Sequence, residues 1–228
     1  MIGMQARDRL IVAADLSSRD EILALADEMH GVAGLLKIGL QAFVANGPTL
    51  VREVVDRGMR VFLDLKLHDI PNTVQHAVRE AEKLGIAMLS VHTSGGGFML
   101  RAANSDKTLI LGVTVLTSLD DAELRRIGFG DGALSIVTHL ARLAADSGLR
   151  GVVASPLEIR AIRESCGDAL KIVAPGVRPA GTDAGDQKRT LTPRQAIAAG
   201  ADYIVVGRPI TEKKNRREAA VRIIEELG

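Results

Sequence analysis

The chain has 228 residues, of which 46% are hydrophobic and 25% charged, and its formal net charge is +1. This balance is that of an ordinary globular protein, and the small net charge excludes a strong electrostatic field for nucleic acid. No apolar run approaches the roughly 20 residues of a membrane span, and the N-terminus lacks the apolar segment of a signal peptide. We therefore expect neither a nucleic acid nor a membrane among its partners.

Eight apolar runs recur along the chain, and each is followed by a segment whose apolar residues have helical spacing. Strands that are apolar throughout are typical of a parallel sheet buried on both faces. The alternation predicts an α/β fold, a (β/α)₈ barrel that forms a single domain over residues 1–228. The predicted strands cover residues 10–14, 35–39, 61–66, 87–92, 108–116, 151–154, 171–174 and 203–206. The main predicted helices cover about residues 41–57, 72–84, 133–147, 193–200 and 217–227.

The third predicted strand ends in charged residues. Alternation along a strand places Phe62, Asp64 and Lys66 on one face, and Asp69 follows in the next loop. Carboxylates close to a lysine favour its charged form, so Lys66 is a candidate proton donor. Taken alone, the motif is more typical of an ion pair that only fills a layer of the barrel, and the rest of the sequence has to favour catalysis.

Polar residues also follow most of the other predicted strands. Barrel enzymes place their sites at the C-terminal ends of the strands, so these residues together predict an active site there. They are Asp15, Lys37, Asp64, Lys66, His92, Thr117, Arg178 and Arg208. Of this set, His92 is interpreted as a structural histidine, and His68 is left out because alternation points it away from Lys66.

The last two strands indicate a phosphate site. Gly176 and Gly207 leave backbone N–H groups accessible at strand ends, and Arg178 and Arg208 add planar cations that bind two oxygens at once. Residues 177–192 lack apolar periodicity, which predicts a mobile loop that closes over the phosphate, with Gln187 inside it. A loop without this role is the alternative.

Two further features carry no predicted function. Cys166 is the single cysteine, so it has no partner for an internal disulfide, and a reduced cytoplasmic protein is the simplest interpretation. The basic run 213–217 is interpreted as the solvated start of a helix.

No cluster of residues has the spacing of zinc ligands, and no metal is predicted.

The motifs, taken in order, resemble the orotidine 5′-phosphate decarboxylase family. The central motif is Asp64-x-Lys66-x-x-Asp69-Ile70-Pro71-Asn72-Thr73, and the others lie at residues 37–39, 113–118, 174–178, 186–187 and 206–211. The resemblance covers the chain from Leu10 to the last helix. In many relatives the last helix opens with Asp-Pro, where this chain has Asn215-Arg216, far from the predicted chemistry.

The resemblance implies decarboxylation of orotidine 5′-monophosphate to UMP and CO₂, the last step of UMP synthesis, by a carboxy-lyase without metal or organic cofactor. It also implies a homodimer whose sites lie at the subunit interface. Lys66 would protonate C6 of the pyrimidine, and Asp64 would face the substrate carboxylate. Lys37 and Lys66 would alternate with Asp64 and with Asp69, which would reach in from the partner subunit. The implied substrate-binding residues are Asp15 and Lys37 at the ribose, Thr117 and Ser118 at the pyrimidine edge, Arg178, Gln187, Gly207 and Arg208 at the phosphate, and Asp69, Ile70 and Thr73 from the partner subunit.

Two alternative functions remain at this stage. A related barrel decarboxylase or aldolase acting on sugar phosphates shares the Asp-x-Lys-x-x-Asp pattern, but it carries an acidic residue on the second strand to help bind Mg²⁺, where this chain has Lys37. A phosphate-ligand sensor on the same scaffold would need no proton donor, so Lys66 between two acids disfavours it.

Overall fold

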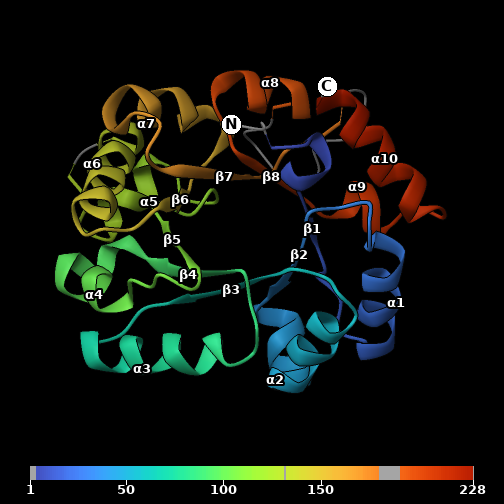
Figure 1. The fold of residues 1–228 in the computed structure, drawn as a ribbon. Helices are drawn as coiled ribbons and strands as arrows, with labels where there is room; N and C mark the ends of the chain where they lie inside the picture. The colour runs from blue at the N-terminus through green and yellow to red at the C-terminus, as the bar shows by residue number, and fades with distance from the viewer. Residues whose placement is uncertain (1–3, 131, 180–190, 228) are drawn as a thin grey trace.

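Eight parallel strands pair in sequence order, and β8 pairs with β1 to close a barrel (Figure 1). The structure is a computed structural model that describes residues 4–130, 132–179 and 191–227. The predicted (β/α)₈ barrel is confirmed. The strands are β1 Leu10–Ala13, β2 Leu35–Gly39, β3 Val61–Leu67, β4 Met88–His92, β5 Leu109–Val113, β6 Gly151–Val153, β7 Lys171–Pro175 and β8 Tyr203–Val206.

Helices surround the strands on the outside of the barrel (Figure 1). They are α1 Arg19–Met29, α2 Leu40–Asp56, α3 Pro71–Glu82, α4 Gly96–Ala103, α5 Asp121–Arg126, α6 Ala133–Asp146, α7 Ile159–Cys166, α8 Pro193–Ala199, α9 Arg208–Thr211 and α10 Arg216–Leu227, with 3₁₀ turns η1 Ala6–Arg9, η2 Thr93–Gly95 and η3 Pro156–Glu158. Among the helices of the described ranges, none has the length and apolar character needed to cross a bilayer.

Two predicted elements differ in detail. The helix predicted over 41–57 is interrupted at Gly47, which adopts a φ of 68° before Pro48, a residue that lacks the N–H needed to continue the helix. The strand predicted over 108–116 ends at Val113. Thr114 still donates to the carbonyl oxygen of Val153, but the chain then turns toward Asp120, which caps α5.

Apolar side chains fill the barrel interior below the C-terminal ends of the strands and form a packed core. These inward-facing residues include Ile11, Leu35, Phe62, Met88, Leu111, Val173 and Tyr203. Because strand side chains alternate, the residue two positions further along points inward as well. On β2, β3 and β4 these residues are Lys37, Asp64 and Ser90. The packed layer therefore supports a polar layer at the C-terminal ends of the strands, which we call the mouth of the barrel.

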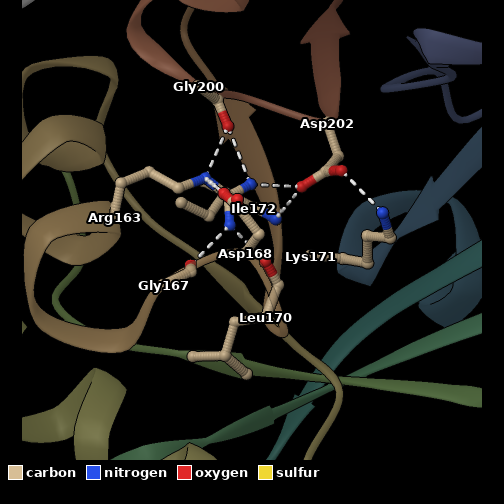
Figure 2. Close-up of polar contacts among 8 residues, drawn as sticks. All are labelled: Arg163, Gly167, Asp168, Leu170, Lys171, Ile172, Gly200 and Asp202. Atoms are coloured by element: carbon tan, nitrogen blue, oxygen red, sulfur yellow. Dashed lines mark hydrogen bonds and ion pairs between the residues drawn. The ribbon is translucent and has the colours of Figure 1, made fainter.

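The N-terminal ends of β7 and β8 are joined by Arg163 of α7 (Figure 2). Its guanidinium pairs with Asp202 at 2.5 Å and donates to three backbone carbonyl oxygens, those of Gly167, Leu170 and Gly200. The Asp202 carboxylate also accepts from the Lys171 ammonium at 2.8 Å and from the Ile172 N–H at 2.9 Å. Both Arg163 and Asp202 are mostly buried, so this network stabilises the end of the barrel opposite the mouth.

We expect Asp202→Asn to lower the free energy of unfolding by about 2–3 kcal/mol, because it weakens charge-assisted hydrogen bonds and leaves the Arg163 cation poorly paired. Urea denaturation measures this change. Lys171→Ala is the control, since its ammonium is half exposed and its ion pair is worth less than about 1 kcal/mol. Equal losses of unfolding free energy in the two variants would contradict the stabilising role of the ion pair between Arg163 and Asp202.

Candidate active site

Four charged side chains of alternating sign cross the mouth of the barrel. The Lys37 ammonium lies 2.8 Å from Asp15 and 3.8 Å from Asp64, and the Lys66 ammonium lies 2.8 and 2.9 Å from the two oxygens of Asp64. Asp64 and Lys37 have side chains only 12% exposed, and Lys66 is 28% exposed. We call this set, Asp15, Lys37, Asp64 and Lys66, the charged row. The structure thus brings together the residues predicted at the ends of the first three strands.

The strand register explains how the charged row forms. In the pairing of β2 with β3, Asp64 lies opposite Gly39, two residues beyond Lys37. A Cβ atom at Gly39 would lie 3.0 Å from the Lys37 nitrogen and 3.3 Å from a carboxylate oxygen of Asp15. Glycine at this position therefore leaves room for the ion pair between Lys37 and Asp15.

Lys66 departs from the predicted strand geometry. It has a φ of 52°, the single positive φ among non-glycine residues of the described ranges, and the β3–β4 register shifts between Leu63 and Leu67. Simple alternation therefore does not account for its backbone conformation. Its side chain nevertheless lies against Asp64, on the side that alternation predicts. Strained backbone of this kind is common at functional sites.

A cavity of about 470 Å³ extends from Asp15, Lys37 and Asp64 of the charged row to the arginines that follow β7 and β8. Its lining includes Asp15, Lys37, Asp64, Gly176, Arg178, Gly207, Arg208 and Glu212. Partial burial and the neighbouring Arg208 lower the pKa of Arg178, and Glu212 acts in the opposite direction. Two guanidinium groups close enough to repel each other form a site suited to a dianion.

Lys66 is not among the residues that line this cavity, although its ammonium contacts Asp64, which is. Asp69, Ile70, Thr73, Thr117 and Ser118 also lie outside the lining. Asp69 is exposed and accepts a hydrogen bond from the N–H of Ile70 at 2.7 Å, without joining the charged row. Ile70 and Thr73 are also exposed, at the start of α3. Thr117 and Ser118 lie in the turn between β5 and α5.

The segment predicted to close over the phosphate is described only at its two ends. The Arg178 N–H donates to the carbonyl oxygen of Leu191 at 3.0 Å, which joins those ends. Gln187 lies outside the described residues.

Comparison with known proteins identifies the family. A sequence model described as the orotidine 5′-phosphate decarboxylase / HUMPS family matches residues 8–223. The chain belongs to this family. An orotidine 5′-phosphate decarboxylase of Moorella thermoacetica is 48% identical, covering 100% of this chain and 95% of the relative, and one of Paramagnetospirillum magneticum is 49% identical, covering 95% and 97%. The crystal structure of an orotidine 5′-phosphate decarboxylase from Lactobacillus acidophilus superposes with a TM-score of 0.85 at 34% identity, covering 96% of this chain and 98% of that one.

This member of the orotidine 5′-phosphate decarboxylase / HUMPS family contains a site residue that the sequence analysis missed. Ser90 of β4 is fully buried, and its hydroxyl contacts both Asp64 and the backbone of Lys66. The signal was present, because Ser90 is a polar residue within an apolar run and lies two positions after the inward-facing Met88.

No group of three or more His, Cys, Asp or Glu residues in the described ranges is arranged to hold a metal ion. The acidic groups of the charged row are separated by lysines. We therefore assign no metal ligands in this site.

His92 lies at the end of β4, half-buried, with its ring centroid 5.6 Å from that of His68. Burial lowers the pKa of His92, the nearby His68 and Lys66 lower it further, and Asp64 opposes the shift. The folded protein therefore favours a neutral His92 beside the charged row.

This shift predicts a pH dependence of stability. The unfolded chain binds a proton at His92 near pH ~6.5, and the folded chain binds it only at lower pH. In the window below about pH 6.5 the unfolded state therefore holds more protons, so the free energy of unfolding should fall as the pH falls. Urea denaturation between pH 5 and 8 measures this slope, and His92→Gln should flatten it. An unchanged slope in that variant would assign the dependence to other groups.

Proposed function

We propose that this protein converts orotidine 5′-monophosphate to UMP and CO₂, the final step of UMP synthesis, with Lys66 as the proton donor to C6 and without a metal ion. The observation that supports this most directly is the cavity with Asp15, Lys37 and Asp64 at one end and Arg178 and Arg208 at the other, with the Lys66 ammonium held against Asp64. A nucleoside monophosphate has a dianion at one end and a reactive base at the other. The names of the relatives indicate the same substrate.

The proposed substrate orientation follows from the charges of the lining residues. The phosphate binds between Arg178 and Arg208 near the backbone of Gly207, with Gln187 closing over it. The ribose hydroxyls bind Asp15 and Lys37, whose ion pair offers both an acceptor and a donor. The pyrimidine then lies over Asp64 and Lys66, with Thr117 and Ser118 contacting its polar edge.

The difficult part of the reaction is the electron pair left on C6. When the bond from C6 to the carboxylate breaks, CO₂ leaves and both electrons stay on a carbon without a π system to delocalise them. A fixed ammonium next to that carbon stabilises the pair electrostatically, by ~4 kcal/mol at ~4 Å in a medium of effective dielectric near 20. The Lys66 N–H proton then passes to C6, and the neutral amine recovers a proton from water.

Asp64 has two roles in this proposal. In the free protein its carboxylate holds the Lys66 ammonium through both oxygens. When substrate binds, the same carboxylate faces the substrate carboxylate, and their repulsion decreases as neutral CO₂ forms. Binding energy from the distant phosphate offsets this repulsion in the bound state.

The charged row supports a reaction without a metal ion. The ammonium groups of Lys37 and Lys66 lie within 3.8 Å of the Asp64 carboxylate and occupy the positions where a metal cation would bind it. Lys37 would also repel a divalent cation, which disfavours the Mg²⁺-dependent sugar-phosphate alternative. We likewise propose no organic cofactor.

We further propose a homodimer in which Asp69, Ile70 and Thr73 complete the site of the partner subunit. Apolar side chains are exposed at the mouth-side starts of three neighbouring helices, namely Val44 of α2 at 79%, Ile70 before α3 at 67% and Phe98 of α4 at 79%. Exposed apolar side chains that form one patch are typical of an interface, and these three helices follow one another around the barrel. We place this dimer in the cytoplasm, because Cys166 has no cysteine with which to form an internal disulfide.

We expect the purified protein to consume orotidine 5′-monophosphate in the presence of EDTA, measured as a change in ultraviolet absorbance with release of CO₂. Lys66→Ala should lower kcat by at least about 1,000-fold, because it removes both the stabilising charge and the proton donor. Lys83→Ala is the matched control, since Lys83 is an exposed lysine paired with Glu80 on α3. Circular dichroism should show both variants folded.

Two results would contradict this function. Activity that disappears with EDTA and returns with Mg²⁺ would show a metal-dependent reaction. Lys66→Ala with the turnover of the Lys83→Ala control would exclude Lys66 as the proton source.

A shared site predicts complementation between two inactive variants. When Lys66→Ala and Asp69→Ala subunits are mixed and allowed to exchange, half of the dimers should be hybrids, and each hybrid has one intact site. Activity should therefore recover to about one quarter of that of the wild type. Mass spectrometry of the intact dimers verifies the exchange. Proven exchange without recovered activity would place Lys66 and Asp69 in the same subunit's site.

A further inference from the structure

The Ser90 hydroxyl contacts two residues of the charged row at once, the Asp64 carboxylate and the backbone of Lys66. It donates to the Asp64 carboxylate at 2.8 Å and accepts from the backbone N–H of Lys66 at 2.9 Å. Ser90 is fully buried, and its neighbours Leu89 and Val91 pack in the apolar layer between strands and helices. One side chain thus connects the backbone of the proposed proton donor to the carboxylate that holds its ammonium.

The left-handed conformation of Lys66 explains why such a contact is needed. Lys66 has a φ of 52°, which L-residues with a long side chain adopt only when their surroundings hold them there. The β3–β4 pairing is interrupted from Leu63 to Leu67, so the N–H of Lys66 lacks a regular position in the ladder. A buried N–H without an acceptor is costly, and the Ser90 hydroxyl supplies that acceptor.

We propose that Ser90 is a positioning residue that fixes the backbone turn at Lys66 and the orientation of Asp64 for the decarboxylation, an inference that rests on the proposed function. Ser90 is not among the residues that line the cavity, so it acts through Asp64 and Lys66. Its hydroxyl hydrogen is donated to the Asp64 carboxylate. Its hydroxyl oxygen accepts from the Lys66 N–H and so fixes the backbone turn. Loss of the hydroxyl should therefore disturb the ammonium position with little effect on phosphate binding at Arg178 and Arg208.

A matched pair of variants separates the hydroxyl from the packing. Ser90→Thr keeps the hydroxyl, and Ser90→Val has nearly the same shape and volume without it, so both crowd the buried position equally. We expect Ser90→Val to lower kcat about 10- to 100-fold relative to Ser90→Thr, because it loses a hydrogen bond to a charged group. The KM should change less than about threefold. If Ser90 only stabilised the fold, kcat would change alike in both variants. Thermal denaturation measures the stability of each variant.

A second measurement does not depend on turnover. Amide hydrogen exchange of Lys66, followed by NMR in the protein without substrate, should be at least about 10-fold faster in Ser90→Val than in Ser90→Thr, because only the hydroxyl protects that N–H. Equal kcat values or equal exchange rates in the two variants would overturn the proposal. A wild-type protein that does not decarboxylate orotidine 5′-monophosphate would contradict the proposed function, and the exchange rates would still decide whether Ser90 holds Lys66.

Discussion

The Asp64 carboxylate, shared between two ammonium groups, is the interaction on which the mouth of the barrel depends. It lies directly above a packed apolar layer and is only 12% exposed, so an isolated charge there would be costly. Lys66 binds both of its oxygens, and Lys37 lies 3.8 Å away and is paired with Asp15 as well. The alternation of sign therefore pairs each charge that the mouth of the barrel buries with an opposite one.

Barrel closure brings the two ends of the chain to one cavity. The charged row comes from the first three strands, and the arginines follow the last two, but β8 pairs directly with β1. A substrate that spans the cavity would thus contact both halves of the chain, with its dianion far from the reacting carbon. In the proposed orientation, this separation would let phosphate binding offset the cost of placing a carboxylate against Asp64, without weakening the charges that act on C6.

Most of the fold and much of the site follow from local sequence rules, and the exceptions have physical causes. Apolar strands and the polar residues after them placed Asp15, Lys37 and Asp64 correctly. Alternation also placed Lys66 beside Asp64, but it did not predict the left-handed backbone of Lys66, because the rule holds only for extended residues and a register shift to β4 cannot be seen in β3 alone. Ser90 was missed because its role depends on contacts across strands. Asp69 is exposed and does not join the charged row, and its proposed role in a partner's site stays a prediction.

The crystal structure of the protein with UMP bound would test the central claim most directly, because UMP is the proposed product with the new C6–H bond already formed. The account predicts that the Lys66 nitrogen is the closest amine to C6, at about 3–3.5 Å, as proton transfer requires. The phosphate should lie between Arg178 and Arg208. A structure in which the phosphate binds the charged row, or in which Lys66 points away from C6, would contradict the account.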